Sequence, residues 1–173
     1  MNGNWAESKE RIVRLSEDRP KVFHIYINLL YTGRVVTDTL ETPKTAKSIA
    51  AEMHILGQLY VFGEKLQDKA AKNSAIQSLL EVALEKDADG DQVNSPIATI
   101  VGIYEGTCAG SLGRRLMVDT WVNTSVEFLA AKGNILPKEF LVDLAVALVN
   151  ERPDKKPKLA TMANMSNYME KMD

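Results

Sequence analysis

The segment from Val22 to Leu30 constrains the fold more than any other, because it would be apolar on nearly every side of a helix. Seven of its nine residues are apolar: Val22, Phe23, Ile25, Tyr26, Ile27, Leu29 and Leu30. A helix that is hydrophobic all round is normally buried, whereas a surface helix carries a single apolar stripe. We therefore expect other parts of the chain to cover this helix on all sides.

Local signals on both sides of this segment predict where the helix begins and ends. Pro20 suits the first helical position, because an N–H group there would have no helical partner, and Ser16 or Asp18 in the preceding turn can cap the helix. Gly33 suits the left-handed residue that ends many helices. Two weakly alternating stretches, Arg11–Leu15 and Val35–Val36, predict short strands on either side of the helix.

Most of the remaining chain carries apolar residues at spacings of three and four, which is typical of amphipathic helices. Such patterns run over residues 49–66, 71–83, 97–104, 112–131 and 137–148, with Ser95 as the cap and Pro96 as the first residue of the third. The sequence therefore predicts a mainly α fold, or more exactly an α+β fold with two short strands.

The acidic run Asp87-Ala88-Asp89-Gly90-Asp91 is the best candidate boundary between packing units. It divides the chain into a first unit at 11–86, a linker at 87–94, a helical extension at 95–150 and a polar, Met-rich tail at 151–173. The tail carries Met162, Met165, Met169 and Met172. Because the helices of the extension have one-sided apolar stripes, we expect them to dock on the first unit.

The composition excludes several classes of protein. Among 173 residues, 21 are basic and 23 acidic, and the net charge of −2 gives no electrostatic footprint for nucleic acid or an anionic membrane. One cysteine and two histidines form neither a disulfide framework nor a closed zinc site. No apolar run approaches the ~18–20 residues of a membrane helix, and the first residues lack a secretory signal. We expect a cytoplasmic or nuclear protein without cofactor or metal.

Three patterns resemble chemical sites but are incomplete. Asp87, Asp89 and Asp91 occupy calcium-loop positions, yet Gln92 and Ala98 replace the required Gly and Glu, so we interpret the run as a linker. Cys108 has no base placed beside it by the sequence, and we interpret it as a small hydrophobic residue and His54 as a structural one.

The third pattern is the glycine-rich turn from Gly106 to Arg115, which precedes a helix. Backbone amides and the helix dipole can hold an anion at such a place, and Arg114 and Arg115 can assist. The turn lacks the Gly-Lys-Ser/Thr ending of a phosphate loop, so a plain interhelical turn with a solvated arginine pair is the favoured interpretation.

Three blocks of the sequence carry a family resemblance. Residues 15–34 read LSEDRPKVFHIYINLLYTGR, an acidic turn and a hydrophobic helix anchored by Phe23 before Tyr31-Thr32-Gly33. Residues 56–68 read LGQLYVFGEKLQD, and residues 70–84 form the next block. In this order and spacing, residues 11–86 resemble the central part of BTB/POZ domains, especially fungal ones. Residues 95–150 are similar to the helical region that follows the domain in fungal proteins.

The resemblance implies a non-enzymatic protein–protein interaction module, with self-association and a role as a scaffold or as a cullin-type ubiquitin ligase adaptor. By resemblance, the partner-binding region involves Glu17, Asp18, Phe23, Tyr26 and Tyr31, although Phe23 and Tyr31 are also expected in the core. Family members carry further residues before the strand that corresponds to Arg11–Leu15, whereas this sequence has ten residues there. The resemblance therefore implies an N-terminally shortened member. The alternative is a small-molecule or anion-binding helical protein that uses the Gly106–Arg115 turn.

Overall fold

The computed structural model describes residues 19–37 and 44–150, and the regular structure in these ranges is helical. The elements are α2 (Pro20–Thr32), α3 (Ala46–Lys65), α4 (Lys69–Ala83), α5 (Ile97–Gly106), α6 (Leu112–Asp119), α7 (Val126–Lys132), the short 3-10 helix η1 (Gly133–Ile135) and α8 (Lys138–Asn150). The prediction of a mainly α protein is confirmed.

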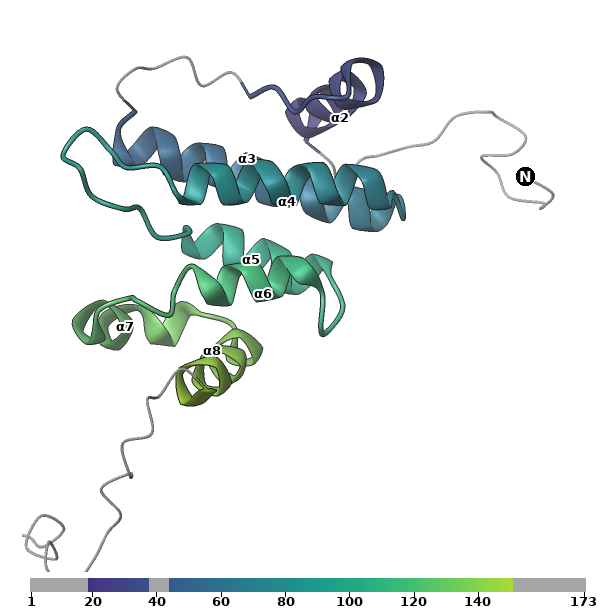
Figure 1. Cartoon of the computed structure of the whole chain (residues 1–173). Coiled ribbons are helices and arrows are strands. Elements are labelled where there is room, and N and C mark those ends of the chain that lie inside the picture. The colour runs from purple at the N-terminus through teal and green to yellow at the C-terminus, as the bar shows by residue number, and fades with distance from the viewer. Residues whose placement is uncertain (1–18, 38–43, 151–173) are drawn as a thin grey trace, which may run out of the picture.

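The helices are arranged in successive layers. α3 and α4 lie side by side, α5 and α6 pack beneath them, and α7 and α8 follow at the end opposite to α2 (Figure 1). Thr45 is the N-cap of α3, where the Thr45 and Ser48 side chains each accept from the other's backbone N–H. Asp68 is the N-cap of α4, and its carboxylate accepts from the Ala71 N–H at 3.0 Å.

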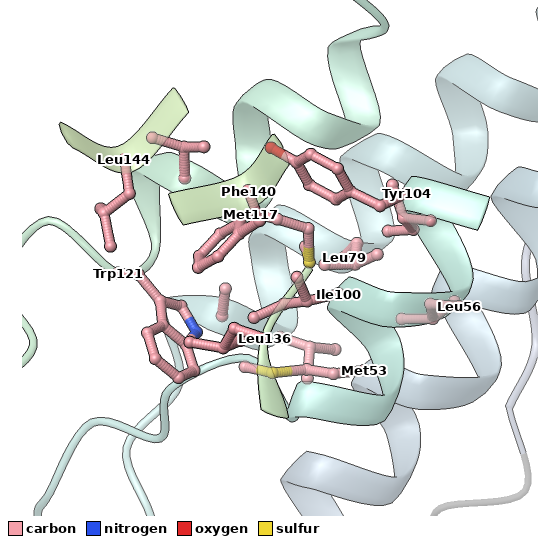
Figure 2. Close-up of a cluster of buried hydrophobic side chains, with 14 of the residues drawn as sticks. Met53, Leu56, Leu79, Ile100, Tyr104, Met117, Trp121, Leu136, Phe140 and Leu144 are labelled. Carbon is pink, nitrogen blue, oxygen red and sulfur yellow. The ribbon is translucent and has the colours of Figure 1, made fainter. Parts of the chain in front are cut away.

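The main core runs through α3, α4, α5, α6 and α8. Met53 and Leu79 come from the first helical pair, Ile100, Met117 and Phe140 come from the later helices, and Trp121 comes from the turn after α6 (Figure 2). The Trp121 and Phe140 rings lie edge to face at 5.6 Å between centroids. Residues 95–150 are therefore docked on the first unit, as their one-sided apolar stripes predict.

The expected single helix over 112–131 is wrong, because the chain leaves the helix between α6 and α7. Trp121 is buried and its indole N–H donates to the Ser95 carbonyl at 3.0 Å, a contact from a distant part of the chain. Residues 122–125 are poor helix formers, and Ser125 caps α7 by accepting from the Phe128 N–H at 3.2 Å. Tertiary packing thus sets this break.

Two further local expectations are corrected. Val35 and Val36 are not in a strand, because no strand among the described residues pairs with them; the other expected strand, Arg11–Leu15, lies outside these residues. α5 begins one residue later than expected: Pro96 is the N-cap, and Ser95 is buried against Trp121 and Thr120. The Met-rich tail at 151–173 also lies outside the described residues.

Candidate protein-interaction surface

Helix α2 forms as its terminal signals predict, with one correction at its start. Pro20 is the first helical residue, but the N-cap is Arg19, whose side chain makes no capping hydrogen bond. Ser16 and Asp18, the expected caps, lie outside the described residues. Gly33 has a left-handed backbone with φ of 68°, and its N–H donates to the Leu29 carbonyl at 2.8 Å. α2 is therefore a well-defined helix with both ends fixed by local geometry.

One side of α2 packs on α3. Val22, Ile25 and Leu29 are buried, and Phe62 of α3 contacts both Phe23 and Tyr26 edge to face, at 6.2 and 5.2 Å between ring centroids. These aromatic pairs and the burial of three aliphatic side chains hold α2 on the helical layers.

A polar contact fixes the same side of α2. The Tyr26 hydroxyl donates to the Asp68 carboxylate at 3.0 Å, next to the N-terminus of α4. Partial desolvation and then this hydrogen bond raise the pKa of Tyr26. The backbone hydrogen bond from Ala71, followed by the bond from Tyr26, lowers the pKa of Asp68. Tyr26 is thus turned towards the molecule and positions α2.

The other side of α2 is apolar and exposed. Phe23, Ile27, Leu30 and Tyr31 follow one another at helical spacing and form what we call the α2 outer face. Phe23 is 42% exposed, Leu30 56% and Tyr31 86%, while Ile27 is half-buried. Because these apolar side chains lie together on one side of a helix, the α2 outer face is a candidate protein-interaction surface.

The five residues expected to bind a partner do not form one surface among the described residues. Glu17 and Asp18 lie outside the described residues. Phe23 and Tyr31 lie on the α2 outer face, so the expectation that both belong to the core is wrong. The expectation that α2 is covered all round is wrong for the same reason: the described helices cover only its Val22–Ile25–Leu29 side. Tyr26 faces Asp68 instead.

Two backbone N–H donors of the Gly106–Arg115 turn are used within the protein. The Gly113 N–H donates to the Tyr60 hydroxyl at 3.1 Å, and the Arg114 N–H donates to the Ser111 hydroxyl at 3.3 Å. A depression of about 340 Å³ lies beside the turn, lined partly by Tyr60, Lys72 and Ser111. The backbone amides of Gly113 and Arg114 are therefore not available to bind an anion in this depression.

The expected solvated arginine pair is half wrong, because Arg114 is buried and only Arg115 is exposed. The Arg114 guanidinium donates to Glu139 at 2.8 Å, to the Thr107 hydroxyl at 3.2 Å and to the carbonyls of Tyr104 and Thr107, and it stacks 4.6 Å from the Tyr104 ring centroid. Arg114 thereby ties α5, α6 and α8 together. Its role is structural.

A cavity of about 190 Å³ between α2, α3 and α5 was not predicted from the sequence. Arg19, His54, Gln58 and Thr99 are its polar lining residues, and Gly102 leaves space on its α5 side. Gln58 Nε2 lies 2.9 Å from His54 Nε2 and, being a donor, makes that nitrogen the acceptor, so His54 Nδ1 donates to Thr99 at 3.3 Å. Gln58 Oε1 is buried without a hydrogen-bond partner.

Burial and then the positive charge of Arg19 lower the pKa of His54, in agreement with a neutral ring. No spacing of residues in the sequence predicts this cavity, because most of its lining residues come from three different helices.

Other kinds of site receive no support from the part of the chain described. These residues hold no cluster of three or more His, Cys, Asp or Glu side chains that could bind a metal ion. Cys108 is exposed rather than the buried hydrophobic residue we expected, and it lines the depression beside the turn, whereas His54 lines the other cavity. Within residues 19–37 and 44–150 no helix has both the length and the apolar character that crossing a membrane requires.

Comparison of the chain with protein-family models, with curated proteins and with solved structures finds no match. The described fold defines a mainly α protein, and the BTB/POZ resemblance stays a prediction.

Proposed function

We propose that this protein is a non-enzymatic protein–protein interaction module and that the α2 outer face is its contact surface. The observation that carries the proposal is the exposure of Phe23, Leu30 and Tyr31 on one side of a helix whose opposite side is anchored in the molecule. Aromatic side chains beside an aliphatic one offer much contact area at little loss of conformational freedom. A rigidly held helix presents them without reorganisation.

The sequence resemblance supplies the class of partner. It supports a role as a scaffold or as an adaptor that joins a substrate to a cullin-type ubiquitin ligase. Self-association is proposed from the exposed apolar side chains of the α2 outer face. A cytoplasmic or nuclear location belongs to the same proposal. The acidic residues Glu17 and Asp18 precede α2 in the sequence and extend the proposed contact region.

The adaptor role is tested by adding a purified cullin N-terminal domain to the immobilised protein. The double variant Leu30→Ser/Tyr31→Ser removes the most exposed apolar side chains of the α2 outer face. Leu80→Ser/Leu84→Ser, which removes an exposed apolar pair at the C-terminal end of α4, is the matched control. We expect the wild type and the control to bind and the α2 variant to lose binding; equal binding by all three would place the contact elsewhere, and no binding by the wild type would remove the cullin role.

A second candidate function, binding of a small molecule, is favoured by the cavity beside His54 rather than by the Gly106–Arg115 turn. The cavity combines apolar walls with the unpartnered Gln58 Oε1, which would accept a hydrogen bond from a ligand N–H or O–H. A thermal-shift screen with small N–H and O–H compounds tests this candidate. Binding should raise the melting temperature of the wild type but not that of Gly102→Leu, which would fill the cavity.

A further inference from the structure

The cavity between α2, α3 and α5 has an unbalanced positive charge at its edge. Arg19 lines it on the α2 side, and none of the described lining residues is acidic. The first turns of α2 and α5, which border the cavity, hold no acidic residue either. The hydrogen bonds and ion pairs of residues 19–37 and 44–150 do not use the Arg19 side chain, which is exposed. This guanidinium is therefore available to an anionic group that enters the cavity.

The hydrogen bonds that run along the cavity wall from α3 to α5 leave one further donor. Gln58 Nε2 donates to His54 Nε2, and His54 Nδ1 donates in turn to the Thr99 hydroxyl oxygen at 3.3 Å. No other hydrogen bond within the described ranges uses the Thr99 hydroxyl, so its hydrogen can be donated to a ligand. Thr99 is only 2% exposed, and it lies so close to Gly57 of α3 that a Cβ atom there would overlap its methyl group. The close packing fixes the position of this donor.

The rest of the cavity wall is apolar. Val22 of α2 and Val61 and Phe62 of α3 line it, and Gly102 leaves space on the α5 side, where a Cβ atom would meet nothing within 4 Å. An apolar cavity of ~150 Å³ in a protein admits a benzene molecule. The cavity described here, of about 190 Å³, therefore has room for one ring, or for a branched aliphatic group of similar size, with a short polar substituent.

We propose that this cavity binds a small carboxylate with an aromatic or branched aliphatic body. The inference rests on the proposed small-molecule function and names the class of ligand. The carboxylate accepts hydrogen bonds from the Arg19 guanidinium and from the Thr99 hydroxyl. The body of the ligand packs against Val22, Val61 and Phe62, and its burial supplies the apolar part of the binding free energy.

The charge of the lining residues favours a monoanion. Burial and then the positive charge of Arg19 lower the pKa of His54, so the ring is neutral at pH 7. Arg19 is then the one cation among the described residues that line the cavity. A single guanidinium balances the charge of one carboxylate, whereas a phosphate dianion would keep an unpaired negative charge beside an apolar wall.

Isothermal titration calorimetry with a matched pair of probes tests the proposal. Phenylacetate carries one ring and one carboxylate, and phenylacetamide has nearly the same shape without the charge. A hydrogen bond to a charged group is roughly twice as strong as a neutral one. We therefore expect the wild type to bind phenylacetate about tenfold or more tightly than phenylacetamide.

Three variants locate the contact. Arg19→Gln should weaken phenylacetate binding about tenfold and leave phenylacetamide binding unchanged. Arg34→Gln removes an exposed arginine beyond the other end of α2, outside the cavity, and should keep the wild-type affinity for both probes. Gly102→Leu, which would fill the cavity, should abolish binding of both. Circular dichroism of each variant checks that the helical fold is retained.

The possible results separate this proposal from the small-molecule function on which it rests. Equal affinity for the two probes, or phenylacetate binding that Arg19→Gln does not weaken, would overturn the carboxylate class and leave small-molecule binding in place. Phenylacetate binding that survives Gly102→Leu would place the site outside the cavity and overturn both. An absence of binding for both probes would also overturn both.

Discussion

At the scale of single residues, burial separates aromatic side chains that the sequence pattern treats alike. Phe62 is 2% exposed and packs in the junction of α2 and α3, whereas Phe23, whose ring meets it edge to face, is 42% exposed. Truncation of a fully buried Phe removes its transfer free energy and leaves a cavity, while truncation of a half-exposed one does neither completely.

We therefore expect Phe62→Ala to lower the free energy of unfolding by about 3–5 kcal/mol. Phe23→Ala should lower it by only about 1 kcal/mol, because it loses a partly exposed ring contact. A core position for Phe23 would instead predict a loss of unfolding free energy as large as that expected for Phe62→Ala. Denaturant unfolding of both variants measures the difference, and equal losses would mean that Phe23 is buried in solution.

His54 provides a pH-dependent test at the same scale. Burial and Arg19 lower its pKa below the unfolded value of about 6.5, so the unfolded state binds more protons just below that pH. The stabilising contribution of the neutral ring is complete above pH ~6.5 and is lost as the pH falls through the lower folded-state pKa. The wild type should lose more stability than His54→Gln on going from neutral to mildly acidic pH.

The exposed histidine on α2 is the control for this experiment. His24→Gln should keep the wild-type difference in denaturant midpoint between the two pH values. If His54→Gln shows the same pH dependence as the wild type, the ring is not held neutral by its surroundings in the cavity.

At the scale of elements, two glycines of α5 distinguish a close helix contact from open space. A Cβ atom at Gly106 would overlap the Val61 side chain of α3, whereas a Cβ at Gly102 would meet nothing within 4 Å. Both positions are helical, so any change in intrinsic helix propensity favours alanine at each. The difference between the two substitutions therefore measures how closely α5 lies against α3.

Gly102→Ala should raise the free energy of unfolding by about 0.5–1 kcal/mol, because alanine loses less backbone freedom in a helix. Gly106→Ala should lower it by about 1–3 kcal/mol through overpacking. Thermal or denaturant unfolding gives both values. Adding Val61→Ala to the Gly106→Ala variant should restore part of the loss, and an absence of any rescue would argue against this helix contact.

Sequence reasoning at this scale succeeded where the signal is local and failed where the partner is distant. Pro20 and Gly33 act as expected because each fixes its own backbone. The break after α6 escaped prediction because it depends on Trp121 reaching Ser95, and the burial of Arg114 escaped because Glu139 is its partner. The exposure of Phe23 and Tyr31 escaped because an apolar pattern does not say which side of a helix is covered.

At the scale of the whole molecule, one core joins the parts on either side of the acidic loop. Ile49 and Met53 precede the loop and share a core with Trp121 and Phe140, which follow it. The loop is exposed at Asp89 but ordered, since the Asp87 carboxylate accepts from the N–H groups of Asp89 and Asp91 at 3.0 and 2.9 Å.

Limited proteolysis with an aspartate-directed protease should cut near Asp89, because that backbone is exposed and not part of a helix. The two fragments should then elute together in gel filtration, held by the shared core. Fragments that separate under native conditions and stay folded would mean that the core does not join them.

The central claim, that the α2 outer face is a contact surface, is tested most directly by sedimentation of the purified protein over a range of concentrations. We predict that the wild type self-associates as its concentration rises and that Leu30→Ser/Tyr31→Ser stays monomeric, because the variant removes the apolar area that drives association. A wild type that remains monomeric throughout, or a variant that associates as strongly as the wild type, would contradict the account.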